Sequence, residues 1–490
     1  MALDSGRSSV QDDPVSSSIF WHDYETTGIN PRNDRPLQVA GVRTDLDLNE
    51  IEAPINFYCQ PSDDILPHPK ACLVTGITPQ QLASQGLREA EFMTRVHAEL
   101  ARPGTCGAGY NSLRFDDEVT RYSLYRNFFD PYAREWQGGN SRWDLIDIVR
   151  TAYALRPDGI VWPQQDGRTS LRLELLTAAN GIDHGQAHEA LSDVRATIAL
   201  ARLIRQKQPK LYDWLFQLRS KQKVLDQIRL LQPLVHISGR FSAARNYLGV
   251  VLPLAWHPRN RNALIVCDLH LDAQPLIDED ADSLRQRLYT RREEMPDGQL
   301  PVPLKLIHIN RCPVVAPLSV LRGEDQQRLE LDMSVYQARA ASLIATAGQW
   351  QDKLPVIYSA EEFAPSEDPE QQLYDGFLGD RDRRLCEQVR SVDPQQLGQG
   401  HWMFDDERLP ELLFRYRARN FSETLNAEER QRWQTFCQQR LSDPLMGAPN
   451  TLGDFERALQ DCWAQADAEQ QALLGQWRSH VQALKLQLGM

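Results

Sequence analysis

The pattern of hydrophobic and polar positions changes twice along the chain. The first part alternates short apolar runs with amphipathic segments, the second consists of short β-rich segments separated by proline and glycine, and the third has helical periodicity. We therefore expect a disordered leader at 1–17, an α/β domain at 18–205, a β-rich domain at 206–358 and a helical domain at 359–490. A chain of 490 residues is long enough for several hydrophobic cores.

Apolar and aromatic runs predict the strands, and amphipathic segments predict the helices. In the first domain, the expected strands are 18–28, 37–44, 55–60 and 105–111. The expected helices there are 91–100, 143–155, 171–180 and 194–205. Strands of the second domain are expected at 234–238, 248–256, 262–269 and 302–309. The order of elements predicts a mixed sheet that begins with a meander.

Two carboxylates lie on the first expected strand. Side chains alternate along a strand, so Asp23 and Glu25 project from the same face, one pleat apart. Like charges at that spacing repel unless something positive lies between them. A hard divalent cation such as Mg²⁺, which takes oxygen ligands, would fill that place. An exposed strand face with solvated acids would show the same short motif.

Further candidates for the same chemistry follow at two helix starts. Asp116 and Asp117 come at a strand-to-helix junction, where acids also favour the helix dipole. His188 and Asp193 flank the start of the helix at 194–205, and the histidine could instead be a surface residue or a cap. Spacing alone does not separate Asp116 from Asp117.

Taken in this order, the acids and the histidine resemble the DEDDh superfamily of 3′→5′ exonucleases. The likeness extends well beyond these residues. The segments that look like bacterial exonuclease I are 22–26, 34–36, 75–80, 109–111, 114–121, 141–144 and 153–157. The resemblance implies a ribonuclease H-like domain with a mixed sheet, then an SH3-like β-barrel domain and a C-terminal helical domain.

The resemblance also implies roles for individual residues. It makes Asp23, Glu25, Asp116 and Asp193 the metal-binding catalytic acids, and His188 the general base. Two Mg²⁺ ions, with Mn²⁺ as a substitute, could hold the attacking and leaving oxygens of a phosphoryl displacement. Histidine suits the deprotonation of water because its pKa lies near neutrality.

Basic and aromatic side chains, which grip single-stranded nucleic acid, are interleaved after Asp116. Phe128 and Phe129 form an apolar pair expected in the core. The expected substrate contacts, several of them implied by the resemblance, are Glu25, Arg121, Tyr132, Trp136, Arg150, Arg172, Lys221, Asn262, Lys305 and His308. The alternating aromatic and basic residues at 414–421 fit helix packing and strand contact equally well.

Composition limits the class of protein. A net charge of −13 argues mildly against a protein that coats nucleic acid, but a locally basic channel remains compatible with it. No apolar run is long enough to cross a bilayer, and 1–17 lacks the order of a signal peptide. The scattered cysteines fit a reducing compartment. We expect a monomeric cytoplasmic protein that does not bind membranes.

The expected function is processive 3′→5′ degradation of single-stranded DNA to nucleoside 5′-monophosphates, in DNA repair and recombination. The resemblance also implies binding of the acidic C-terminal tail of single-stranded-DNA-binding protein, with Arg156 and Arg322 in matching segments. Two alternatives stay open: an exonuclease that prefers RNA or short oligonucleotides, and a strand-binding or recruiting protein without activity. The first alternative differs from the expected function in that the enzyme would tolerate a 2′-hydroxyl at the 3′ end of its substrate.

Overall fold

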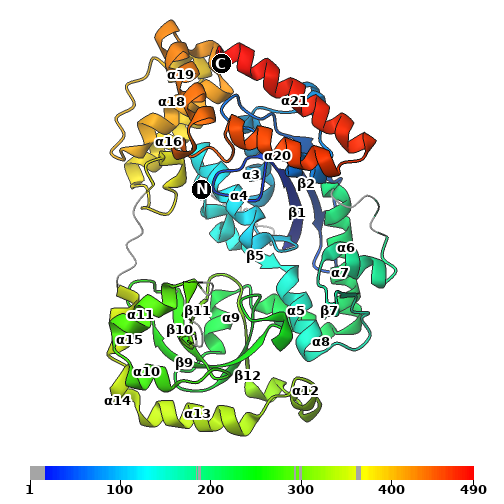
Figure 1. Cartoon of the computed structure of the whole chain (residues 1–490), viewed down its shortest axis with the longest axis vertical. Helices are drawn as coiled ribbons and strands as arrows, with labels where there is room; N and C mark the ends of the chain where they lie inside the picture. Colours follow the sequence, from blue (N-terminus) through cyan, green and yellow to red (C-terminus); the bar gives the residue numbers. More distant parts are fainter. Residues whose placement is uncertain are drawn as a thin grey trace, which may run out of the picture.

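The computed structural model describes residues 17–183, 185, 189–291, 294–296, 299, 301–359 and 366–490. Figure 1 shows the first domain, in blue to teal, between the green β-rich domain and the orange-to-red helical domain. Apart from residue 17, the expected leader at 1–17 lies outside the described residues. Among the described residues, no helix combines the length and apolar character needed to cross a membrane.

The first domain contains a mixed sheet with the strand order β3-β2-β1-β4-β5, as expected. Strands β1 (Ser18–Thr26), β2 (Pro36–Thr44) and β3 (Ile55–Tyr58) form an antiparallel meander. Strands β4 (Thr105–Gly109) and β5 (Ser141–Asp144) continue it, and both run parallel to β1. The described residues also form a separate two-stranded ribbon of β6 (Gln164–Gln165) and β7 (Arg168–Thr169).

Helices cover this sheet. They are α1 (Pro69–Thr75), α2 (Pro79–Gln85), α3 (Glu89–Leu100), α4 (Asp116–Arg126), α5 (Leu145–Leu155), α6 (Leu173–Ala179), α7 (Ala190–Lys207) and α8 (Pro209–Gln217), while α9 (Lys221–Asp226) lies in the β-rich domain (Figure 1). The helix expected from residue 143 is wrong at its start, because Trp143 lies in β5. Asp144 then caps α5 by accepting a hydrogen bond from the Ile146 N–H.

Alternation along β1 divides its side chains between two cores. Phe20 and Tyr24 pack with α4 residues on one face of the sheet. Ile19 and Trp21 belong to the core on the other face, where α7 packs against β1 and β2. Asp23 and Glu25 share the odd-numbered face with Ile19 and Trp21, so their carboxylates are directed toward the α7 side.

The second domain contains a five-stranded antiparallel sheet with the order β11-β10-β9-β8-β12. Its strands are β8 (Leu234–Ile237), β9 (Leu248–Trp256), β10 (Ala263–Asp268), β11 (Leu304–His308) and β12 (Val314–Pro317). Its helices are α10 (Gln274–Asp278), α11 (Ala281–Tyr289), α12 (Gly323–Arg328), α13 (Met333–Ala345), α14 (Ala347–Trp350) and α15 (Lys353–Ser359). The sequence patterns had not predicted β12 or these helices.

Helix α8 packs with the first domain. The rings of Tyr212 and Phe216 lie 5.2 and 4.9 Å from the ring of Trp143 on β5. The predicted division between residues 205 and 206 assigns this helix to the second domain, so the division cuts through a packed core. The domain limits remain predictions.

The third domain is helical. It consists mainly of α16 (Asp380–Ser391), α17 (Pro394–Leu397), α18 (Arg408–Asn420), α19 (Ala427–Ser442), α20 (Leu452–Gln465) and α21 (Ala468–Leu488). Segment 414–421 lies mostly in α18, where Phe414 and Tyr416 are buried and Arg415 and Arg417 form ion pairs. Helix packing therefore explains its alternating pattern.

A buried ion network joins the third domain to the first. Asp64 and Arg35 of the first domain meet side chains from 368–440. Arg419 pairs with both Asp64 and Glu370, and Arg440 pairs with Asp64 and with Asp368 at 3.0 Å. Hydrophobic contacts surround this interface, and the indole N–H of Trp477 donates to the Ile77 carbonyl at 3.0 Å. The third domain is thus fixed to the first by both charge and apolar packing.

Candidate active site

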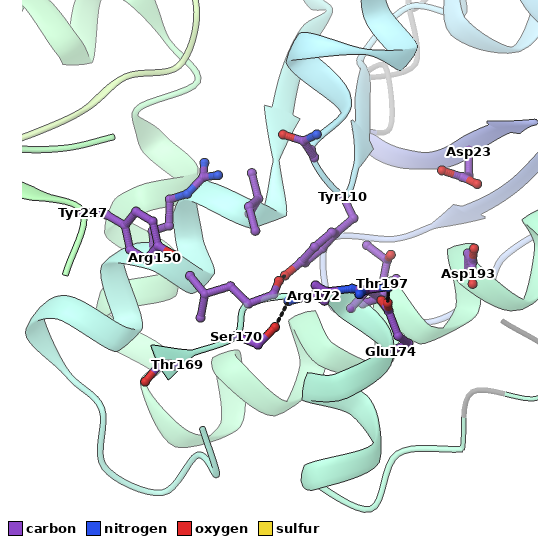
Figure 2. A pocket seen from close by; sticks show the side chains of 14 residues that line it. Asp23, Tyr110, Arg150, Thr169, Ser170, Arg172, Glu174, Asp193, Thr197 and Tyr247 are labelled. Carbon is purple, nitrogen blue, oxygen red and sulfur yellow. Dashed lines mark hydrogen bonds and ion pairs between the residues drawn. The ribbon is translucent and has the colours of Figure 1, made fainter. Parts of the chain in front are cut away.

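The acids on β1 meet an acid from α7. Ligand oxygens of Asp23, Glu25 and Asp193 all lie within 4.8 Å of one another. Figure 2 shows Asp23 on its strand facing Asp193 on the helix. The meeting follows from the fold, since α7 packs across β1 and Asp193 lies in its first turn. The family resemblance had placed these acids in one site, and the structure brings them together.

Asp116 reaches the backbone of β1 beyond the end of the β1–β4 pairing. The registered pairing of β1 with β4 ends at Trp21, and farther along β1 the Asp116 carboxylate accepts a hydrogen bond from the Tyr24 N–H at 3.2 Å. Tyr24 lies between Asp23 and Glu25, so Asp116 stands beside the cluster. Asp117 points elsewhere, into a pair of arginines. This difference favours Asp116 as the fourth acid.

Burial and mutual repulsion disfavour charge on these acids. Burial, with the nearby Asp193, raises the pKa of Asp23 to about 8. Burial and the charges of Asp23 and Asp193 raise the pKa of Glu25 to about 9. The pKa of Asp116 is also well above its ordinary value, because it is buried and lies near Asp23.

A divalent cation fits this donor set. Carboxylates crowded at this distance repel one another, which together with burial raises their pKa values, and a positive charge between them would relieve the repulsion. Hard cations such as Mg²⁺ take oxygen ligands and would supply that charge. Metal binding requires deprotonated carboxylates, so these acids would release protons as a cation binds near neutral pH.

His188, the expected general base, lies outside the described residues. The chain next to it is described from Glu189, whose carboxylate caps α7 by accepting a hydrogen bond from the Ser192 N–H at 2.8 Å. Asp193 follows in the same turn. The role of His188 remains a prediction.

A cavity of about 580 Å³ extends from the acids and contains two of the expected substrate contacts. Arg150 and Arg172 line it together with Asp23 and Asp193. Figure 2 shows the acids at one end and Arg150 with Tyr247 at the other. Pattern reasoning did not select Tyr247, whose ring lies 5.5 Å from the Arg150 guanidinium, because it comes from the second domain.

The same cavity contains Tyr110 and Asn111, which belong to the resembling segment 109–111 but are not among the expected substrate contacts. Asn111 has a left-handed backbone with φ of 62°. Its N–H donates to the Asp144 carboxylate at 2.8 Å. A signal was present in the sequence, since a glycine-rich strand end followed by asparagine is typical of a tight turn.

Lys305 and His308 line a larger cavity of about 1070 Å³ between the domains. Arg114 of the first domain and Tyr374 of the third also line it. The Lys305 ammonium lies 3.7 Å from the centre of the Phe241 ring, and burial lowers the pKa of Lys305 to about 7. These β11 residues thus face a space bordered by all three domains.

Trp136 and Lys221 line a further cavity of about 590 Å³. The Trp136 side chain is 64 % exposed, which leaves its ring free to stack. The Lys221 ammonium donates to the Asn262 side-chain oxygen at 2.6 Å. Lys221 and Asn262, two expected substrate contacts that are far apart in sequence, therefore lie together.

Arg121 and Tyr132 have a different environment. Arg121 is buried and pairs with Glu118 and Glu135 at 2.8 and 2.7 Å. Its guanidinium lies 5.4 Å from the centre of the Tyr132 ring, and that ring also contacts Phe377. These contacts give both residues packing roles and leave Arg121 little free surface. Phe128 and Phe129 are buried in the core, as expected.

Comparison with known families agrees with this architecture. A mixed sheet carrying clustered carboxylates is found in residues 20–201, which match a family model described as "Exonuclease". The protein is therefore an exonuclease. Residues 219–360 match the exonuclease I SH3-like domain, and residues 367–484 match the exonuclease I C-terminal domain. The chain belongs to the exonuclease I family.

Relatives match over nearly the whole chain. Exodeoxyribonuclease I of Escherichia coli (strain K12) is 48% identical over 428 residues, which covers 86% of this chain and 90% of that protein. The solved structure of a moderately thermophilic exonuclease I from Methylocaldum szegediense has a TM-score of 0.91 at 47% identity, covering 96% of this chain and 99% of that one. A zinc-bound E. coli exonuclease I complex with single-stranded DNA also has a TM-score of 0.91, at 45% identity, covering 96% and 99%.

Proposed function

We propose that this protein degrades single-stranded DNA processively from the 3′ end, releasing nucleoside 5′-monophosphates, in DNA repair and recombination. The observation that carries the proposal is the cluster of Asp23, Glu25 and Asp193 at one end of a cavity that also contains Arg150 and Arg172. Arginines suit the phosphates of a strand whose terminus reaches the acids. The relative solved with single-stranded DNA supports this choice of substrate.

Asp23, Glu25, Asp116 and Asp193 would hold two Mg²⁺ ions, with Mn²⁺ as a substitute. When bound, the ions supply positive charge to the attacking and leaving oxygens of phosphodiester hydrolysis. The raised pKa values of these acids and the zinc-bound relative support a site for divalent cations. The arginines of the cavity orient the scissile phosphate, and His188 accepts a proton from the attacking water.

We expect His188→Ala to lower turnover by about 100- to 10,000-fold, the range typical of general acid–base catalysis. The fold should persist, because substitution by alanine removes a base without burying an unpaired charge. Single-turnover cleavage of labelled single-stranded DNA measures the rate, and circular dichroism checks the fold. A wild-type rate in this variant would remove His188 from the role of base.

The test of the proposed function uses single-stranded DNA labelled at the 3′ or the 5′ end, matched RNA, and duplex DNA. We expect rapid Mg²⁺-dependent loss of the 3′ label from single-stranded DNA, no loss in EDTA, and slow action on RNA and duplex. Faster cleavage of RNA would favour the alternative of an RNA or oligonucleotide exonuclease. Binding without cleavage would favour the inactive recruiting protein.

The acidic C-terminal tail of single-stranded-DNA-binding protein is a proposed partner of Arg156 and Arg322. Arg156 lies beside the segment that carries Arg322, since its guanidinium donates to the Val320 carbonyl at 3.1 Å and pairs with Asp325 at 3.0 Å, and Arg322 itself pairs with Glu324. The Arg322 side chain is about half exposed. A basic pair of this kind suits an acidic peptide. We further propose that the protein acts as a cytoplasmic monomer.

A further inference from the structure

Asp117 has two arginine partners in the interior of the first domain. One carboxylate oxygen accepts from Arg134 at 2.6 Å, and the other accepts from Arg142 at 3.1 Å. The side chains of Asp117, Arg134 and Arg142 are 3%, 1% and 6% exposed. Burial alone would raise the pKa of Asp117, but the two guanidinium groups hold it below its ordinary value.

These ion pairs lie at the start of α4, the helix that carries Asp116. Asp116 and Asp117 are the first two residues of α4, and the residue before them, Phe115, provides no side-chain cap. A helix start without a cap leaves backbone N–H groups unsatisfied and is prone to fray. The two arginines therefore hold the first turn of α4 through Asp117, while Asp116 faces β1.

Arg142 extends this connection to the SH3-like domain. The Arg142 guanidinium donates to the Asn310 carbonyl at 3.1 Å, and the Cys312 thiol donates to the Arg142 carbonyl at 3.0 Å. Asn310 and Cys312 belong to the turn between β11 and β12. The Arg142 side chain thus joins the turn between β11 and β12 to Asp117, which is next to Asp116.

We infer that Asp117 is a positioning residue for Asp116, and that Arg142 makes this positioning depend on the docked SH3-like domain. The inference rests on the proposed function, because Asp116 matters as one of the acids that hold the metal. Partners that orient a metal ligand typically change metal affinity or activity by about 10- to 100-fold when removed.

The first test is Asp117→Asn in the full chain. We expect the dissociation constant for Mn²⁺, measured by titration calorimetry, to rise about 10- to 100-fold. We also expect kcat to fall, KM for single-stranded DNA to stay unchanged, and high Mn²⁺ to restore part of the rate. Wild-type Mn²⁺ affinity and kcat in this variant would overturn the inference.

Glu89→Gln provides a matched control. Glu89 pairs with Arg126, the last residue of α4, so this variant loses a buried ion pair at the opposite end of the same helix. We expect a lower melting temperature and unchanged Mn²⁺ affinity. An equal loss of affinity in both variants would overturn the inference, because general loosening of α4 would then explain the effect.

Arg142→Lys covers the case in which Asp117→Asn does not fold. Lysine keeps the positive charge but cannot bridge Asp117 and the Asn310 carbonyl with a planar fork. Arg134 still neutralises Asp117 in this variant. We expect Mn²⁺ affinity about 10-fold weaker than in the wild type, and unchanged affinity would overturn the inference. If the wild type itself neither bound metal nor cleaved DNA, the proposed function would fail instead.

Discussion

Asp23→Asn is expected to abolish cleavage of single-stranded DNA while leaving DNA binding largely intact. Asp23 has the other acids as neighbours: its carboxylate lies with those of Glu25 and Asp193 within 4.8 Å, and its charge adds to burial in raising the pKa of Asp116. Metal ions contribute several kcal/mol to charge stabilisation in such reactions, so we expect a loss of about 1,000-fold or more in kcat. The arginines of the cavity do not depend on Asp23 for their own ion pairs.

The measurement combines single-turnover cleavage with fluorescence anisotropy of a labelled strand in EDTA. Asp213→Asn, which changes an exposed acid on α8, is the control and should cleave at the wild-type rate. Mn²⁺ titration should show weaker binding in Asp23→Asn only. Retained wild-type cleavage would remove the proposed metal site from β1.

Local geometry predicted the acid pair on β1, and the family resemblance supplied the other acids. Strand alternation places Asp23 and Glu25 on one face, whereas Asp193 was selected through the family resemblance and meets them because α7 packs across β1. The choice between Asp116 and Asp117 was not predictable in this way. It depends on Arg134 and Arg142, which come from later segments and meet Asp117 only in the folded domain.

An error at Trp143 and an unexpected environment at Arg121 have the same physical origin. Trp143 continues an apolar helical pattern, but it lies in β5 because that strand pairs with β4. Arg121 lies among aromatic residues as a DNA contact would, yet its charge is neutralised by Glu118 and Glu135. In both cases a tertiary partner decided the outcome, and a periodic pattern does not reveal such partners.

The cavity contacts show how far motif reasoning extends. Arg150 and Arg172 could be chosen because they resemble strand-contacting positions of a known family, and both line the cavity beside the acids. Tyr247 could not be chosen, since its place there requires the SH3-like domain to dock against α5. Sequence patterns do not identify a residue that a different domain contributes to a site.

Glu370→Gln is expected to destabilise the protein by about 3–5 kcal/mol, the cost typical of breaking a buried ion pair. The Glu370 carboxylate is 3% exposed and is paired with Arg35 at 2.5 Å and with Arg419. Arg415 and Arg440 lie within 4.0 Å of it. A neutral amide would leave these guanidinium groups with less negative charge than they need at the interface between the first and third domains.

Lowering the pH should reduce the difference in stability between the wild type and Glu370→Gln. Burial alone would raise the pKa of Glu370, but the surrounding arginines hold it well below its ordinary value of 4.5. A depressed pKa contributes stability that is present above pH 4.5 and is lost as the pH falls toward the folded-state value. Urea unfolding at pH 7 and at successively lower pH should therefore show the wild-type advantage shrinking in acid, because the glutamine does not titrate.

The control for this experiment is Glu91→Gln, which breaks an exposed pair with Arg95 one turn along α3. Such pairs contribute about 0.3–0.5 kcal/mol, so its urea midpoint should lie close to that of the wild type. A Glu370→Gln midpoint equal to that of Glu91→Gln at pH 7 would mean that apolar packing alone holds the third domain. The contacts of Trp477 with the first domain would then carry that interface, and the charge network would be dispensable.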